Sequence, residues 1–308
     1  MKTGIFLSYR GLGANMLHLS YCHEIAKKYG PVNLVTLCPN LREALKYDPS
    51  FEQIIYLGDH HKKFFDILKL SKFFKSLKFE NFFIFYPSFR YFLSSKIAGI
   101  PNIYQYPLFK KKRLHLVNAA KQFTERSLKI NNCPTETKIF INKDQLNYYK
   151  KNNLKKIIVG IGSSGPTTRW GYRNYSNLIK KLKSYKKFYF YLLCGSDEND
   201  GAEQIIKEVG SDFCESLSKK NIDEIINYVA ISDLYIGNDS FGHHLACQMD
   251  KPCFIILLNS PKAYSDYSKN QYRIIPPHKN IDEIDHGSKL DPNTISVDMV
   301  IDKIKKFI

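Results

Sequence analysis

The sequence predicts an α/β protein with two successive domains, each built on a parallel sheet covered by helices. Short apolar runs typical of buried strands alternate with segments of helical periodicity. This alternation stops in a polar stretch over residues 131–156 and then starts again. The chain has 308 residues, enough for two domains of roughly 150 residues each. We therefore expect an N-terminal domain over residues 1–152 and a C-terminal domain over residues 153–308, with a cleft between them.

The N-terminal domain opens with a predicted βαβ unit. Residues 3–9 form a strand, residues 10–15 a glycine-bearing turn, residues 15–29 a helix and residues 32–37 a second strand. The turn is only a weak dinucleotide-binding signature, because Met16 stands where the complete motif has its third glycine. The rest of the domain is predicted to contain three more strands, over residues 54–57, 82–86 and 103–106, and a helix over residues 89–98.

Two basic segments of this domain suit anionic partners. Residues 62–78 form an amphipathic helix with apolar residues on one side and lysines on the other. We favour a helix that covers the sheet over one that lies on a membrane surface. The run from Lys110 to Arg113, which includes Lys111, suits an anionic acceptor, although such runs are commonly just solvated.

The α/β alternation resumes in the C-terminal domain. Strands are predicted over residues 157–162, 188–194, 234–237 and 253–256, and helices over residues 174–184, 222–229 and 241–248. The final segment, residues 294–308, carries apolar residues at helical spacing. We expect a packing helix there, which could brace the N-terminal domain.

Composition narrows the class of protein. The net charge of +17 favours anionic partners such as nucleotides, phosphorylated sugars or lipid headgroups, but no recognised nucleic-acid-binding module accompanies it. No apolar run approaches the roughly 20 residues of a membrane span, and the start is too short in apolar residues for a signal peptide. Seven scattered cysteines indicate buried thiols in a reducing compartment, so we expect a cytoplasmic protein.

No metal site is expected from the sequence. His60-His61 and His243-His244 are adjacent pairs, and adjacent residues of a helix do not share a face.

The stretch from Gly237 to Ala246 is the strongest functional candidate. A strand ends at Gly237, and Asp239-Ser240 then opens a helix, at the carboxyl edge of the sheet where α/β folds bind phosphate-bearing ligands. His244 lies one helical turn beyond Ser240, so backbone amides, a hydroxyl and an imidazole can converge on one anion. A capped helix with a buried histidine is the alternative.

Three stretches resemble glycosyltransferase family 9, the heptosyltransferase-like enzymes of lipopolysaccharide assembly. Gly11-Leu12-Gly13-Ala14-Asn15 resembles the first strand-to-helix turn of the family. Gly162 to Trp170 resembles its Pro-Thr-Lys-Arg-Trp loop, and Gly237 to Ala246 resembles its Gly-Asn-Asp-Ser-Gly-Pro-x-His-Leu-Ala signature. The three stretches occur in the order of the family and together span most of the chain.

The resemblance implies a GT-B fold, with two Rossmann-like domains facing each other across a cleft, and an inverting transfer that requires no metal and no cofactor. The donor, a nucleotide-sugar, would bind the C-terminal domain, and the acceptor, an anionic cell-envelope glycan or glycolipid, the N-terminal one. Peripheral contact with the inner membrane is compatible with this. The implied donor-binding residues are Gly162, Ser163, Thr167, Thr168, Arg169, Asp239, Ser240, Gly242 and His244, and the acceptor-side residues are Gly13, Ala14, Asn15, Lys111 and Arg113.

The sequence departs from the family at two positions. Ala14 stands where the family places an aspartate that acts as general base, and Thr168 stands in place of a donor-binding lysine, so that Arg169 would take over its role. His18, His23 or Asp59 could substitute for the missing base. Two alternatives therefore remain beside the transferase: a GT-B-like nucleotide-sugar-binding protein with impaired turnover, and another sugar-nucleotide enzyme such as a 2-epimerase.

Overall fold

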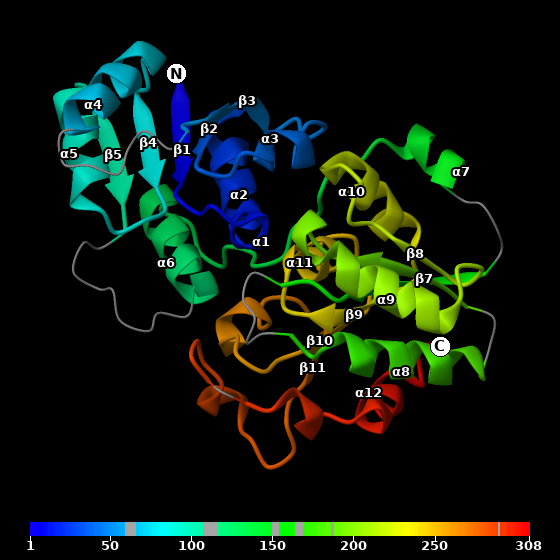
Figure 1. Cartoon of the computed structure of the whole chain (residues 1–308). Coiled ribbons are helices and arrows are strands. Elements are labelled where there is room, and N and C mark those ends of the chain that lie inside the picture. Colours follow the sequence, from blue (N-terminus) through cyan, green and yellow to red (C-terminus); the bar gives the residue numbers. More distant parts are fainter. Residues whose placement is uncertain (59–65, 107–115, 150–153, 164–168, 186–187, 289) are drawn as a thin grey trace. The chain divides into compact units, whose positions relative to one another are not determined.

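The structure is a computed structural model that describes residues 1–58, 66–106, 116–149, 154–163, 169–185, 188–288 and 290–308 (Figure 1). The chain divides into two compact units, Met1–Thr137 and Lys138–Ile308. Each unit is built around one parallel sheet, as the sequence predicts. We describe the two units separately.

The N-terminal unit has a five-stranded sheet in the order β3-β2-β1-β4-β5. Its central strands are wholly buried, which explains their continuous apolar runs, since helices cover both faces of such a sheet. The chain moves from β1 to β2 and β3 on one side and then returns to β4 and β5 on the other. The strands are β1 (Thr3–Leu7), β2 (Val32–Thr36), β3 (Phe51–Tyr56), β4 (Asn81–Ile84) and β5 (Asn102–Gln105).

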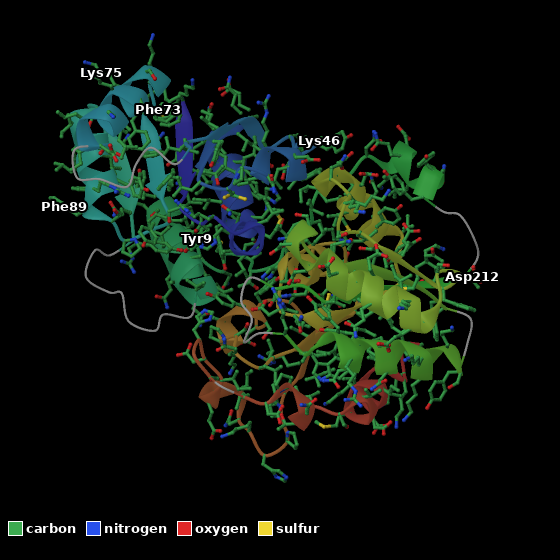
Figure 2. The ribbon with its side chains drawn as sticks, viewed as in Figure 1. Tyr9, Lys46, Phe73, Lys75, Phe89 and Asp212 are labelled. Carbon is green, nitrogen blue, oxygen red and sulfur yellow. The ribbon has the colours of Figure 1, made fainter. Side chains whose placement is uncertain are left out.

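Helices α4 and α5 lie side by side near β4 and β5 in this unit (Figure 1). Leu70 and Phe74 of α4 are fully buried in the core, and Lys75, labelled in Figure 2, lies on the outer side of the helix. The described part of the predicted helix over residues 62–78 therefore covers the sheet, as expected, and residues 62–65 lie outside the described residues. The helices of the unit are α1 (Leu12–Met16), α2 (Leu19–Tyr29), α3 (Leu41–Ala44), α4 (Asp66–Leu77), α5 (Phe89–Ile97) and α6 (Leu116–Leu128).

The C-terminal unit has a six-stranded sheet in the order β11-β10-β9-β6-β7-β8. The chain runs outward from β6 to β7 and β8, and then crosses back to β9, β10 and β11 on the other side. The strands are β6 (Lys155–Gly160), β7 (Phe188–Leu193), β8 (Cys214–Ser216), β9 (Leu234–Asn238), β10 (Cys253–Ile256) and β11 (Gln271–Ile274). The direction of winding thus reverses between β6 and β9.

Alternate residues of these strands point to opposite faces of the sheet. Ile157 and Val159 belong to one core together with residues of α8, α9 and α12. On the other side α10 and α11 contact β6, and the rings of Tyr191 and Tyr228 lie 4.8 Å apart. The helices are α7 (Leu146–Tyr149), α8 (Tyr172–Lys183), α9 (Asn199–Val209), α10 (Ile222–Ile231), α11 (Phe241–Cys247) and α12 (Val297–Ile304), with short 3₁₀ turns at Lys143–Gln145, Ser196–Glu198, Lys262–Tyr264, Ile281–Glu283 and Pro292–Thr294.

The division between the units falls after Thr137, earlier than the boundary expected at residue 152. The polar segment that follows belongs to the C-terminal unit because it contacts that unit directly. Ile139 donates a backbone hydrogen bond to Gln248, and the Tyr149 ring packs against Tyr228 at 5.1 Å. The low apolar content of this segment therefore does not mark a linker.

Helix α12 packs on α8 and β11 of its own unit. Val300 and Ile304 are fully buried in that core, so this segment is the packing helix that its apolar spacing predicts. None of the helices in the described part of the chain has the length and apolar character needed to cross a lipid bilayer. All seven cysteines are buried and free, as the prediction of buried thiols requires.

Candidate functional site

The candidate site lies at the carboxyl ends of β6 and β9. These two strands are hydrogen-bonded neighbours, with Gly160 opposite Gly237. They are also the pair at which the winding of the sheet reverses, and a sheet of this kind binds ligands in the crevice at that point. The loop that begins after β6 and the turn that joins β9 to α11 therefore emerge next to each other.

Glycine is needed where the two strands approach. A Cβ built on Gly237 would lie 2.5 Å from the backbone oxygen of Gly160. A Cβ on Gly242, in the first turn of α11, would lie 2.4 Å from Leu193. The small residues of the predicted motif thus let strand β6 and helix α11 pack closely on their neighbours.

Asn238 joins the two loops. Its side-chain amide donates to the Ile161 carbonyl at 2.8 Å, and its side-chain oxygen accepts from the Trp170 N–H at 3.0 Å and from the Tyr175 hydroxyl at 2.8 Å. All these groups are buried, so each bond satisfies a polar group that would otherwise be costly to bury. Asn238 therefore holds both ends of the segment from Ile161 to Trp170 against β9.

Asp239, Ser240 and His244 come together at the start of α11, as predicted. The Ser240 hydroxyl lies 3.1 Å from the Tyr235 hydroxyl, which also donates to the Asn238 carbonyl at 2.7 Å. The nearest carboxylate oxygen of Asp239 lies 3.8 Å from His244 Nε2. The other ring nitrogen of His244 lies 2.7 Å from the Tyr267 hydroxyl. These contacts fix the orientation of both side chains.

His243 also belongs to this group. Its Nδ1 lies 3.1 Å from Asp239 Oδ1, and its Nε2 lies 3.1 Å from the Tyr264 carbonyl. The expectation that the adjacent pair His243-His244 could not share a site is therefore wrong. The two rings lie with centroids 3.7 Å apart at the first turn of α11, where Asp239 stands just before the helix and reaches both.

Burial and neighbouring groups set the charges of Asp239 and His244. Burial raises the pKa of Asp239, but hydrogen bonding and charge from His243, followed by His244 and Ser260, outweigh burial and hold the pKa below its ordinary value. Burial, assisted by His243, lowers the pKa of His244 well below its ordinary value despite the pull of Asp239. His244 is therefore neutral at neutral pH, so it can donate a hydrogen bond to a phosphate but adds no positive charge to the site.

Arg169 is paired with a buried carboxylate that the sequence analysis missed. Its Nη2 lies 2.7 Å from Glu198 Oε1, and Glu198 also accepts from the backbone N–H groups of Ser163 at 3.2 Å and Gly195 at 3.0 Å. Glu198 thus ties Gly162-Ser163 after β6 to the turn after β7. The guanidinium keeps other donors, since its Nε has no hydrogen-bond partner among the described residues. Thr167 and Thr168 lie outside the described residues.

On the N-terminal unit, Gly13, Ala14 and Asn15 lie in α1, directly after β1. Asn15 is buried, and its amide donates to the carbonyls of Tyr9 at 3.0 Å and Gly11 at 2.8 Å. Asn15 thereby closes the turn, while the half-buried Ala14 presents a methyl group. Lys111 and Arg113 lie outside the described residues, as does Asp59.

His18 lies in an aromatic environment between α1 and α2. Tyr9, labelled in Figure 2, stacks on its ring at 4.7 Å, and Phe85 meets it edge-on at 5.6 Å. His18 Nδ1 donates to the Ala14 carbonyl at 2.7 Å, which leaves Nε2 as an acceptor with no partner among the described residues. Burial lowers the pKa of His18 to about 4, against the upward pull of that hydrogen bond.

This geometry gives no support to His18 as the substitute base. The side chain is only 1% exposed, so an acceptor hydroxyl cannot reach it, and its low pKa makes proton uptake unfavourable. His23 is held between Asp48 and Thr137, each at 2.6 Å, and is also buried.

The comparisons with known proteins agree with the architecture. The family model for glycosyltransferase family 9 (heptosyltransferase) matches residues 93–287, more than half of the chain. Lipopolysaccharide heptosyltransferase 1 of Campylobacter coli is 28% identical over 143 residues, which are 45% of this chain and 42% of that protein. The match thus spans less than half the length of this curated relative.

Solved structures share the fold over the whole chain. An E. coli ADP-heptose lipopolysaccharide heptosyltransferase II is similar with a TM-score of 0.78 and 16% identity, covering 100% of this chain and 98% of that one. A family 9 glycosyltransferase of Veillonella parvula has a TM-score of 0.77 and 14% identity, with 99% and 96% covered. The E. coli heptosyltransferase WaaC with ADP has a TM-score of 0.72 and 12% identity, with 100% of both chains covered.

These structural similarities confirm the predicted fold class. The match to the family model, which covers more than half of the chain, shows the family to which the chain belongs. The chain belongs to glycosyltransferase family 9.

Proposed function

We propose that this protein transfers a sugar from a nucleotide-sugar donor to a lipopolysaccharide-type acceptor, with inversion and without a required metal ion or cofactor. Family membership supports glycosyl transfer. The curated relative is named as a lipopolysaccharide heptosyltransferase, and one similar structure contains ADP, so an ADP-sugar is the first donor to test.

The observation that carries the proposal is the placement of the donor-site residues. Asp239, Ser240 and His244 follow β9, and Gly162 and Ser163 follow β6, so both groups flank the reversal point of the sheet. Neutral and cationic N–H groups can donate there to a diphosphate, while the carboxylate of Asp239 suits hydroxyl donors of a ribose or sugar. Such preorganised donors stabilise the charge that grows on a departing diphosphate.

The acceptor is proposed to be an anionic glycan or glycolipid bound by the N-terminal unit. The net charge of +17 supports an anionic partner because the field of the protein raises its local concentration. The basic run from Lys110 to Arg113 would contribute, as would contact with an anionic membrane surface.

The proposal is tested by calorimetry with a panel of nucleoside diphosphates and nucleotide-sugars. We expect at least one to bind, and we expect Asp239→Ala to weaken that binding at least about tenfold, or about 1.4 kcal/mol. Asp212→Ala is the matched control, since Asp212 is an exposed aspartate of the same unit (Figure 2) and its loss should leave the affinity unchanged. Absence of binding across the panel, or an unaltered affinity of Asp239→Ala, would contradict the donor site.

A second candidate is a nucleotide-sugar-binding protein without turnover. The specific observation in its favour is Ala14, whose methyl group offers no proton acceptor where the family has an aspartate. Product analysis with the bound nucleotide-sugar separates the two: transfer or donor hydrolysis supports the enzyme, while binding without either supports the second candidate.

A further inference from the structure

Three potential metal ligands meet at the start of α11. One ligand atom from each of Asp239, His243 and His244 lies within 4.8 Å of the others. The side chains are buried, with 10% of Asp239, 0% of His243 and 4% of His244 exposed. Two imidazoles and one carboxylate are a donor set that suits first-row divalent metals such as zinc, cobalt and iron.

The hydrogen bonds of His243 leave a lone pair facing Asp239. The Tyr264 carbonyl can only accept, so its contact with Nε2 at 3.1 Å places a proton on Nε2. The Ser240 N–H points at Nδ1 from 3.2 Å, which requires a lone pair on that nitrogen. When Nδ1 carries this lone pair, Nδ1 and Asp239 Oδ1 are two acceptors 3.1 Å apart, and a metal ion can bridge them in place of the proton through which His243 hydrogen-bonds to Asp239.

The ring nitrogens of His243 and His244 that face away from Asp239 make the hydrogen bonds that are common for metal-binding histidines. A metal ligand imidazole commonly donates its second N–H to a carbonyl or another oxygen, which fixes the tautomer. The Tyr264 carbonyl does this for His243, and the Tyr267 hydroxyl, 2.7 Å from Nδ1, is placed to do it for His244. His244 Nε2 then carries the lone pair and lies 3.8 Å from Asp239 Oδ1.

We propose that Asp239, His243 and His244 form a binding site for a divalent transition metal ion, through Oδ1, Nδ1 and Nε2 respectively. Tetrahedral ligands of zinc at about 2.0–2.1 Å from the metal lie about 3.4 Å from one another. The two separations from Asp239 Oδ1, 3.1 and 3.8 Å, bracket this value, and the two histidine nitrogens lie within 4.8 Å of each other. The ion replaces the long hydrogen bond from the Ser240 N–H.

Metal binding at this site removes the hydrogen bond that His244 would donate to a phosphate of the nucleotide-sugar. This consequence rests on the proposed function. His244 Nε2 can donate to a phosphate only when it carries a proton, and it can bind a metal only when it does not. The metal-bound protein is therefore a form with weakened nucleotide binding, and transfer itself remains independent of metal.

The experiment is a titration of EDTA-stripped, full-length protein with Co²⁺, followed by its visible absorption. We expect one ion per chain with imidazole and carboxylate ligands, and at least about tenfold weaker binding in His243→Gln. His278→Asn removes an exposed histidine outside the cluster and should bind Co²⁺ as the parent does. X-ray absorption of the zinc-loaded parent should show two imidazoles and one oxygen ligand, which tests the site even if a variant misfolds.

Three results would overturn the proposal: no stoichiometric metal binding by the parent, equal binding by parent and His243→Gln, or sulfur ligation. Sulfur ligation would place the ion on the thiols of Cys247 and Cys253, since Cys253 Sγ lies 3.6 Å from the His243 carbonyl and Cys247 contacts Cys253. Zinc-loaded protein freed of excess metal should bind ADP more weakly than stripped protein, and equal affinity would contradict the competition. Nucleotide binding measured in EDTA tests the transferase separately, so that the two proposals can fail independently.

Discussion

Replacing Ala14 with aspartate is expected to raise the rate of sugar transfer by about 10²–10⁴, the usual contribution of a positioned general base. Ala14 lies in α1 directly after β1 and is only half-buried, so a carboxylate there keeps contact with solvent and stays ionised. The parent has no proton acceptor at this position and should be slow. The measurement is kcat for transfer with the nucleotide-sugar found by calorimetry.

The matched control is Ala14→Asn, which has the same size but cannot accept a proton at neutral pH. Only the aspartate variant should gain rate, and its kcat should fall at low pH as the new carboxylate is protonated. Equal rates for the aspartate and asparagine variants would show that another group supplies the base. If the parent and both variants bind the nucleotide-sugar but none of them transfers or hydrolyses it, the second candidate, a nucleotide-sugar-binding protein without turnover, is favoured.

His18 is expected to make the protein acid-sensitive. Its pKa is about 4 in the folded state, against an ordinary value of 6.5 that the unfolded chain restores. Between these values the unfolded state binds more protons, so the stabilisation is present above pH 6.5 and is lost as the pH falls toward 4. The free energy of unfolding should decrease by about 3 kcal/mol over this range from His18 alone, roughly a hundredfold in the folding equilibrium.

Urea unfolding of the parent and His18→Gln at several pH values measures this effect. Glutamine retains an N–H that can reach the Ala14 carbonyl but does not titrate, so the difference in stability between the two proteins should shrink as the pH falls. His278→Asn, at an exposed position, should follow the parent. A constant difference between parent and His18→Gln across the range would show that His18 takes up no proton on unfolding.

Predictions from the sequence succeeded where the signal was local. The alternation of apolar strands with helices predicted both parallel sheets, and the Gly-Asn-Asp-Ser stretch marked the end of β9 and the start of α11. Strand β11 was missed because Gln271–Ile274 is a short, half-buried edge strand without a continuous apolar run. The boundary near residue 152 was misplaced because polar composition was taken for a linker, whereas contacts such as that of Tyr149 with Tyr228 decide membership of a unit.

The sequence by itself determined the fold class, the family and the positions of Asp239, Ser240 and His244, because strand periodicity, turn chemistry and motif spacing are written in consecutive residues. Only the tertiary structure showed that His243 reaches Asp239, that Glu198 neutralises Arg169, and that His244 and His18 are uncharged. These properties depend on burial and on partners distant in sequence, and both are created when the sheet and its helices pack together.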